Sequence, residues 1–423
     1  MFTAGFAESN ITPEEYPVTT YMGRVDSALE PLYAQCAYFS DGAAEVLLFS
    51  VNVVMLEFPL VAEIRSAISE RCGIPPENIM LSATHNHACP AVIDRPHFPR
   101  EEGYLRFLCG RLVECALAAR QNESEAVLGL GRAYEKRINF NRRFIKRDGT
   151  VVSQPRSTAE LLCNEGVVDP EVGVCRITDR SGRMRAILVN FACHAVHQMG
   201  QIAGGYPGVL RQLLRQQYGS DCTVLFLNGP CGNIIHRNFE DPARTDSKEY
   251  SGQCLAEDVS AVLSAPMTVL EPRLTVRNTH MRGYYRPLDE LRRNSGKMEQ
   301  FNVLPAVLKN GWYDWSLQEL EKMHAAAEGE DFSVQTFGFG TGFSLSAVPC
   351  EYFSQYALRI KEKLPGQYVF LAAPANGWLG YVPFSGCFAR RGGHETTTAY
   401  WSKMAPDTGD RIEAVLLQHL CHG

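Results

Sequence analysis

Residues 44–54 read AEVLLFSVNVV, and the chain continues with PLVAEIRSAISERCG (59–73) and NIMLSATHNH (78–87). The first run is apolar and β-branched, which is typical of a buried strand. In the second run apolar residues recur at helical spacing and Gly73 closes the segment, so we expect a helix. The third run opens as another short strand. Together the three segments predict a β-α-β unit.

The same order of elements returns in the middle of the chain. We expect RAILVNFACH (185–194) to form a strand, YPGVLRQLLRQQYG (206–219) a helix, and CTVLFLNGPCGN (222–233) a strand that runs into a turn. In both units, polar residues follow directly after a strand. Because α/β folds bind ligands at the carboxyl ends of their strands, we expect the functional site there.

The remaining chain adds strands, turns and one predicted insertion. Residues 129–184 are rich in strand and loop patterns, with a hairpin turn at Asp148 and Gly149. Residues 284–330 change to long, polar, mostly helical sequence, which we interpret as an insertion or lid over the core. No Pro/Ser-rich linker divides the chain. We therefore expect residues 1–423 to form a single α/β domain.

Size and charge limit the classes of function. The 423 residues are 45% hydrophobic, which is enough to bury a substantial core. The formal net charge of −6 comes from interspersed charges without a Lys/Arg run, so we expect no nucleic-acid partner. The first residues lack a signal-peptide pattern, and no apolar run reaches the roughly 18–20 residues that span a bilayer. We expect a cytoplasmic protein without stable membrane association, whose 14 cysteines are mostly small buried apolar residues.

His85 and His87 lie one residue apart directly after a predicted strand. In an extended strand, side chains at i and i+2 point to one face, so the two imidazoles could bind a metal together. A catalytic histidine pair and a polar surface turn are the alternatives. His194 follows another predicted strand, and three imidazoles, or two with a carboxylate, suit zinc with an open water position. His197 competes with His194 but is better explained as a loop or core histidine.

Three further residues are candidates for chemistry. Glu351 follows the apolar run SLSAVPC and precedes a predicted helix, so it is either a metal ligand or a helix cap. Tyr381 lies in NGWLGYVP, where the glycines favour tight turns. Cys231 in NGPCGN is a candidate nucleophile, which needs a histidine or a helix dipole beside it. NGPCGN lacks the lysine and the spacing of a phosphate-binding loop.

The motifs SATHNH, NFACHAVH, GGYPG, LNGPCGN, VPCE and NGWLGYVP occur in an order that resembles the amidase domain of the neutral/alkaline non-lysosomal ceramidase family. The resemblance covers nearly the whole chain, starting at residues 11–13 (ITP). It implies a layered α/β fold, a sandwich of mixed β-sheets flanked by helices. It also implies a zinc hydrolase with one zinc ion per chain, in a divergent cytoplasmic member of the family.

The resemblance assigns roles to individual residues. It implies four metal ligands: His85, His194, Glu351 and Tyr381. His87 matches the histidine that faces the substrate, and Arg142 matches the family's site arginine, with Arg143 as the adjacent alternative. The remaining candidate substrate contacts are Asn141, Arg143, Asn228, Cys231 and Trp378.

Two departures from the family bear on the substrate. The family segment equivalent to LNGPCGN contains a serine proposed to act in catalysis, whereas residues 229–232 of this chain are Gly, Pro, Cys and Gly. We also expect no C-terminal immunoglobulin-like domain. A cytoplasmic enzyme without a membrane-binding surface is poorly placed to extract a two-chain lipid from a bilayer, which disfavours ceramide as the substrate.

We therefore predict a zinc-dependent hydrolase that attacks an amide, or a related carbonyl, of a small soluble substrate with a zinc-activated water. His87 would stabilise the oxyanion or protonate the leaving group, and Arg142 would orient a polar or anionic substrate. One alternative is a zinc-dependent hydrolase or lyase acting on a small polar sugar derivative, which a pocket rich in Arg, Asn and Trp would favour. Another is a non-catalytic binding protein on the same fold. The ligand set alone does not distinguish zinc from iron or manganese, and the oligomeric state stays open.

Overall fold

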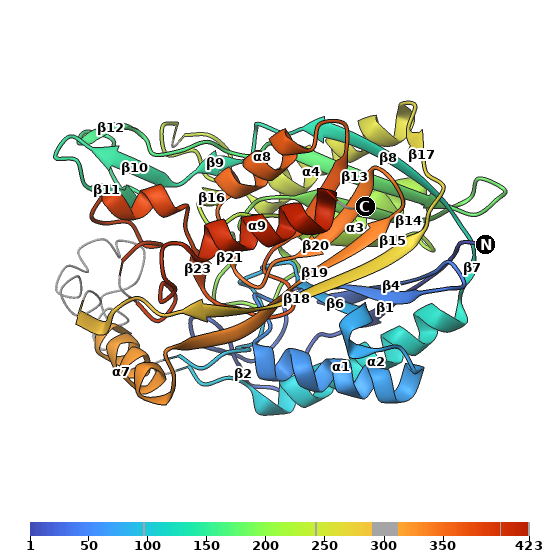
Figure 1. The fold of residues 1–423 in the computed structure, drawn as a ribbon, viewed down its shortest axis with the longest axis horizontal. Helices are drawn as coiled ribbons and strands as arrows, with labels where there is room; N and C mark the ends of the chain where they lie inside the picture. Colours follow the sequence, from blue (N-terminus) through green and yellow to red (C-terminus); the bar gives the residue numbers. More distant parts are fainter. Residues whose placement is uncertain (96–97, 242, 290–311, 398, 422–423) are drawn as a thin grey trace.

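The computed structural model describes residues 1–95, 98–241, 243–289, 312–397 and 399–421 (Figure 1). The first predicted β-α-β unit is present in it. The unit consists of β5 (Glu45–Val51), α1 (Phe58–Cys72) and β6 (Ile79–Ala83), and the two strands pair in parallel. Gly73 ends α1 with a φ of 71°, a left-handed conformation that glycine adopts without a Cβ clash.

A five-stranded sheet is built on this unit in the order β6-β5-β4-β1-β7. Its other strands are β1 (Thr3–Asn10), β4 (Tyr33–Ser40) and β7 (Ser124–Glu125). Helix α2 (Glu102–Gln121) packs beside α1 and against β1 and β4, and Figure 1 shows both helices along one side of this sheet. Most of the apolar residues of α1 and α2 are thereby buried against the strands.

The second predicted β-α-β unit is also present. It consists of β14 (Met184–Phe191), α3 (Gly205–Tyr218) and β15 (Thr223–Asn228), and again the strands are parallel. The second five-stranded sheet has the order β15-β14-β13-β8-β17. Its remaining strands are β8 (Val127–Tyr134), β13 (Glu171–Thr178) and β17 (Thr268–Val269). Helix α4 (Lys248–Ser264) packs beside α3 on this sheet.

A third sheet has the order β18-β19-β20-β22. Its strands are β18 (Leu274–Tyr284), β19 (Gly329–Phe339), β20 (Phe343–Ala347) and β22 (Tyr368–Ala372). Helix α9 (Thr408–Cys421) packs on β18 and β19, and α8 (Ser354–Lys363) packs on α9. The chain is thus the predicted α/β sandwich of mixed sheets flanked by helices.

One apolar core joins the three sheets. Two of its many residues from each sheet serve as examples: Phe39 and Leu48 from the first, Leu128 and Leu188 from the second, and Phe337 and Leu345 from the third. Because each sheet has another layer of helices or loops on its other side, its central strands are buried on both faces. This explains why the strand at residues 44–54 reads as a continuous apolar run and not as an alternating one.

Short strands and a hairpin complete the fold. The predicted turn at Asp148 and Gly149 connects β10 (Arg143–Lys146) to β11 (Val151–Ser153), and β12 (Leu161–Asn164) pairs with β10. In the described part of the chain, six further two-residue strands form three pairs: β2 (Val18–Thr19) with β3 (Arg24–Val25), β9 (Phe140–Asn141) with β16 (Ile234–Ile235), and β21 (Glu351–Tyr352) with β23 (Tyr381–Val382).

The predicted insertion at 284–330 lies between β18 and β19, which are antiparallel partners. Its last part forms helix α7 (Trp312–Ala326), while residues 290–311 lie outside the described residues. A role as a lid stays a prediction. None of the helices in the described part of the chain is both long and apolar enough to cross a membrane.

Candidate metal centre and active site

A cavity of about 460 Å³ is lined by residues that follow the last strand of the first β-α-β unit and the first strand of the second. Strand ends of this kind are where α/β folds bind their ligands. Six of the predicted site residues line the cavity: His87, Arg142, His194, Glu351, Trp378 and Tyr381. We therefore take this cavity as the candidate site.

Backbone pairing brings the distant segments together at this cavity. Asn86 forms a parallel bridge with Ala195, and the His87 N–H donates to the Ala195 carbonyl at 3.0 Å. On another side, Glu351 of β21 is the register partner of Tyr381 of β23. Side chains that are far apart in the sequence are thus fixed next to one another by main-chain contacts.

The backbone at His85 differs from the prediction. β6 ends at Ala83, and His85 has a φ of 59°, so His85 and His87 do not share one face of an extended strand. The bend still brings the two rings together, with centroids 4.9 Å apart and Nε2 atoms 3.5 Å apart. A non-glycine residue in the left-handed region is uncommon, and such residues cluster at functional sites.

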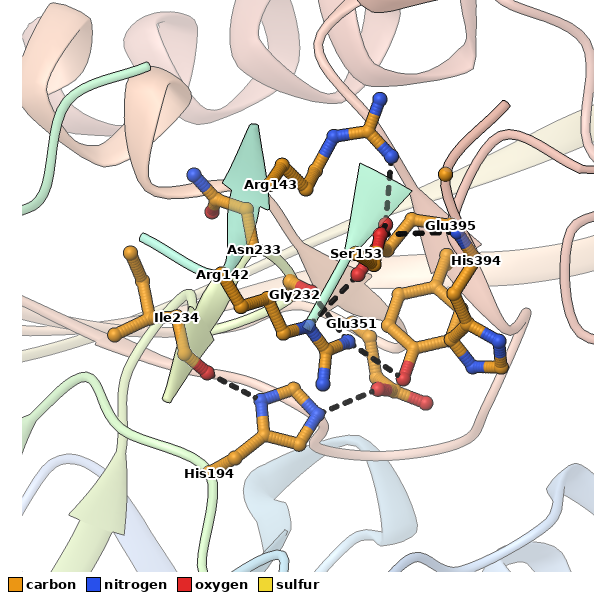
Figure 2. Close-up of polar contacts among 12 residues, drawn as sticks. Arg142, Arg143, Ser153, His194, Gly232, Asn233, Ile234, Glu351, His394 and Glu395 are labelled. Carbon is orange, nitrogen blue, oxygen red and sulfur yellow. Dashed lines mark hydrogen bonds and ion pairs between the residues drawn. The ribbon is translucent and has the colours of Figure 1, made fainter. Parts of the chain in front are cut away.

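His85 and His194 both direct their Nε2 atoms toward the same place, near Glu351. Nδ1 of His85 lies 2.8 Å from the Val54 carbonyl, and Nδ1 of His194 lies 2.8 Å from the Ile234 carbonyl. Because a carbonyl oxygen only accepts, both Nδ1 atoms carry a proton, which leaves Nε2 as the nitrogen that can bind a metal. Metal-binding histidines are fixed in this way by a partner of their other nitrogen. Figure 2 shows His194 between Ile234 and Glu351.

The Glu351 carboxylate faces both of these Nε2 atoms. Its Oε2 lies 3.1 Å from His194 Nε2 and 3.3 Å from His85 Nε2, and its Oε1 accepts from Trp378 Nε1 at 3.1 Å. Burial alone would raise the pKa of this carboxyl group, but the two histidines hold it well below its ordinary value. The helix-cap alternative is wrong, since α8 begins only at Ser354 and the carboxylate points to the histidines.

This donor set fits a cation. When neither Nε2 carries a proton, lone pairs of two nitrogens and one carboxylate oxygen face one another, and a cation between them removes their repulsion. Burial lowers the pKa of His194 to about 3, so a proton on that ring does not supply the charge at neutral pH. Nitrogen and carboxylate ligands in such a cluster are those that zinc binds. The Tyr381 hydroxyl hydrogen bonds with the Glu351 carboxylate, which keeps it beside the cluster as a fourth candidate ligand.

Cys231 also belongs to this cluster, although the sequence placed it among the substrate contacts. The potential ligand atoms of His85, His194 and Cys231 all lie within 4.8 Å of one another. The Cys231 sulfur accepts from Asn228 Nδ2 at 3.1 Å, and burial raises the pKa of this thiol to about 12. Because the thiolate is the form that binds metals, the ionised Glu351 is the better third ligand and Cys231 is the alternative.

His87 lines the cavity beside the cluster. Its ring contacts that of Tyr21 with centroids 4.8 Å apart, and no described residue lies within hydrogen-bonding distance of its Nδ1. Burial, and then the neighbouring His85 and His194, hold the pKa of His87 well below its ordinary value. A neutral imidazole with an unsatisfied nitrogen therefore stands next to the candidate metal ligands.

Arg142 belongs to a buried network at the cavity wall (Figure 2). Its Nε donates to Glu395 Oε1 at 2.7 Å, and its Nη2 donates to the Gly232 carbonyl at 2.8 Å and to the Tyr381 hydroxyl at 3.0 Å. Burial opposes the charged form, but Tyr381 and Glu395 outweigh it and raise the pKa of Arg142. The guanidinium thus holds the Tyr381 hydroxyl in place.

Sequence reasoning missed Glu395, the centre of this network. Its buried carboxylate also accepts from Arg143 Nη1 and from the Ser153 hydroxyl, both at 2.6 Å. Burial would raise the pKa of Glu395, but Arg142 and Arg143 lower it to about 2. The neighbouring His394 lines the cavity. The only available signal was GGHETT (392–397), which has no recognised metal or catalytic spacing.

Four of the five predicted substrate contacts do not line this cavity: Cys231, described above, and three others. Arg143 is fully buried and its guanidinium bonds Glu395 and other groups of the network. Asn141 accepts from the Arg143 N–H at 2.9 Å and lines a separate groove. Asn228 is buried beneath the cluster, against Cys231. In the structure these side chains support the site and do not contact the cavity.

Comparisons with known proteins agree with this architecture. No protein-family model matches the chain, and no curated protein matches it significantly. Among solved structures, neutral ceramidase from Pseudomonas aeruginosa superposes with a TM-score of 0.73 at 15% identity, over 98% of this chain and 73% of that one. The fold is that of neutral ceramidase. A ceramidase complexed with C2 agrees, with a TM-score of 0.76 at 15% identity, over 98% of this chain and 74% of that one.

Proposed function

We propose that this chain is a zinc-dependent hydrolase that cleaves an amide, or a related carbonyl bond, of a small soluble substrate. One observation carries the proposal: Nε2 atoms of two tautomer-fixed histidines and a charged carboxylate converge beside a cavity. The ceramidase-like fold supports hydrolysis of an amide. We also propose a divergent relationship to that family.

His85, His194 and Glu351 would hold the metal, with Tyr381 beside them, at about one ion per chain. When bound, zinc polarises a carbonyl oxygen and lowers the pKa of water from 15.7 to roughly 7, which makes a serine nucleophile unnecessary. The Trp378 indole, which donates to Glu351 Oε1 at 3.1 Å, leaves Oε2 as the oxygen directed at the histidines.

His87 is the proposed proton carrier at this site. Its ring is neutral and borders the cavity, and its Nδ1 lacks a partner among the described residues. It can therefore donate a hydrogen bond to a carbonyl oxygen, or take a proton from the attacking water and pass that proton to a leaving amine. Arg142 has a positioning role, because Glu395 balances its charge and its Nη2 holds the Tyr381 hydroxyl. A substrate anion would compete with Glu395 for the same guanidinium.

We further propose a cytoplasmic location. All 14 cysteines are free, and 11 of them are buried. Such a set of thiols suits a reducing compartment, where disulfides rarely persist.

A second candidate function is a zinc-dependent hydrolase or lyase that acts on a small polar sugar derivative. The cavity favours it because aromatic rings line part of the wall and polar side chains line another part. The aromatic residues are Tyr21, Trp315, Trp378, Tyr400 and Trp401. Aromatic faces beside hydrogen-bonding groups suit a ring that carries hydroxyls better than a long acyl chain.

The test is metal content together with hydrolysis. The protein is purified without a metal-binding tag and analysed by plasma mass spectrometry, before and after removal of metal with a chelator. It is then assayed against a panel of small amides and amino-sugar amides. We expect about one zinc per chain and amide cleavage that stops without metal and returns with zinc. A protein that binds no zinc and cleaves nothing would instead favour the non-catalytic binding protein.

A further inference from the structure

A second histidine pair lines the same cavity. His197, from the loop after β14, stacks on His236, which follows β16, with ring centroids 3.5 Å apart and planes inclined by 18°. Neither residue belongs to the metal-binding cluster, and the proposed reaction does not use them. The sequence suggested a loop or core role for His197 and did not single out His236.

The stacked pair has unused hydrogen-bonding capacity. Within the described chain, Nδ1 of His197 and Nδ1 of His236 have no partner, and neither does Gln198 Oε1 beside them. His236 is 6% exposed, and its ring donates a hydrogen bond to the backbone of Asp246. Its free Nδ1 is therefore the unprotonated nitrogen of a neutral ring. Gln198 Oε1 is an acceptor as well, so a ligand can satisfy these two atoms only by donating hydrogen bonds to them.

The surrounding charges are matched. Arg237 Nε lies 2.6 Å from Asp246 Oδ2, and Lys248 Nζ lies 3.4 Å from Glu249 Oε1, and all four residues line the cavity. Among the described residues, no cation of this wall is left over for a carboxylate or a phosphate, and an ionised carboxylate has no hydrogen to donate. Hydroxyl groups can donate to the two acceptors without bringing a charge.

The two rings do not serve as acids or bases. Burial lowers the pKa of His197 to about 2 and that of His236 to about 3, so both are neutral at every physiological pH. His197 is also anchored, since its Nε2 lies 3.1 Å from the Ser251 hydroxyl of α4. Fixed neutral rings of this kind suit recognition of a neutral ligand.

We propose that His197 and His236, with Gln198, form a subsite that binds the hydroxyl groups of a neutral, polyhydroxylated substrate moiety, such as a sugar-like or polyol-like ring. The moiety would place one face on the aromatic residues of the cavity, among them Trp378 and Tyr400. The inference deepens the proposed function, because it names the group attached to the amide that reacts beside His194. It does not require the metal for binding.

The test compares two probes by calorimetry. N-acetyl-D-glucosamine and N-cyclohexylacetamide both carry an acetamide on a six-membered ring, but only the first has ring hydroxyls. We expect the wild type to prefer the hydroxylated probe by about tenfold or more, because buried polar groups built for a hydroxyl reject an analogue without it. His236→Phe keeps an aromatic ring for the stack and should bring the ratio close to one.

Two further variants complete the design. Gln198→Leu changes a half-buried loop residue, so it reports on the subsite even where His236→Phe fails to fold, and we expect a partial loss of the ratio. The matched control is His280→Phe, an exposed histidine on β18, which should keep the full ratio. The preference should also persist in His194→Ala, so failure of the hydrolase proposal would not remove it. A wild-type ratio near one, binding of neither probe, or a ratio that survives both His236→Phe and Gln198→Leu would overturn the subsite.

Discussion

Two histidine pairs at one cavity use their ring nitrogens in different ways. His85 and His194 each place Nδ1 at 2.8 Å from a backbone carbonyl and turn Nε2 toward Glu351. His197 and His236 stack on each other, and within the described residues their Nδ1 atoms have no partner. The first arrangement suits a cation, and the second suits a ligand that donates hydrogen bonds.

Burial does not explain the difference, because it lowers the pKa in both pairs, to about 3 for His194 and to about 2 for His197. What differs is the group that faces the free nitrogen. A charged carboxylate that faces the lone pairs of two ring nitrogens favours a bound metal, whereas two rings stacked on each other do not. Within one fold, the groups that contact a histidine ring therefore decide its chemistry more than its degree of burial does.

The largest expected effect separates the two pairs directly. His85→Ala and His194→Ala each remove one of the proposed metal ligands, so we expect the loss of bound metal and of all turnover. His197→Ala, three residues along the chain, should keep the metal. Plasma mass spectrometry on the three purified variants measures this. Equal metal content in His194→Ala and His197→Ala would mean that the two pairs do not differ as described.

The next effect tests which residue is the third ligand. Glu351→Gln keeps the shape of the side chain but removes its charge, so we expect most of the metal and the activity to be lost. Cys231→Ala should retain the metal, because burial keeps that thiol protonated, with a pKa of about 12. Zinc affinity is measured by competition with a chromophoric chelator. The opposite order of affinities would make Cys231 the third ligand in place of Glu351.

A smaller effect is expected at His87, which borders the cluster and is not one of the proposed ligands. His87→Ala should keep about one metal ion per chain while kcat falls by about 10²–10⁴-fold, as for the loss of a general acid or base. The readout is metal content and kcat on the same preparation, against any amide that the wild type cleaves. Loss of the metal in this variant would move His87 into the ligand set.

The sequence predicted the fold from features that burial imposes. Both β-α-β units were predicted because strands covered on both faces are continuous apolar runs, and because glycines at 73 and 219 end the helices. The hairpin turn at Asp148 and Gly149 followed from turn chemistry in the same way. Residues 290–311 of the predicted insertion lie outside the described residues, so its lid function is untested.

The site was predicted less completely, for physical reasons. His85, His194 and Glu351 were named together, but only through a family resemblance, since their meeting depends on pairings such as Asn86 with Ala195. Glu395 was missed because a buried carboxylate between two arginines has no local spacing that marks it. His236 was missed for a similar reason, because its stacking partner His197 comes from another loop. Contacts between single side chains that are far apart in the sequence produce no periodic pattern of residues.

The smallest expected effect concerns stability at acid pH. Burial lowers the pKa of His197 to about 2 and that of His236 to about 3, whereas the same rings in the unfolded chain titrate near 6.5. Below pH 6.5 the unfolded chain therefore binds protons that the folded chain refuses, so the free energy of unfolding must fall as the pH falls. Between pH 7 and pH 5 each ring should cost about 1–2 kcal/mol.

The double variant His197→Phe/His236→Phe keeps two stacked rings but removes both titrations. Its free energy of unfolding in urea should fall less between pH 7 and pH 5 than that of the wild type, whatever its absolute stability. The exposed His280→Phe, which leaves the stacked pair in place, should follow the wild type. Parallel losses in all three proteins would mean that the folded chain protonates the stacked rings as the unfolded chain does. A charged pair would no longer suit a neutral ligand that donates hydrogen bonds.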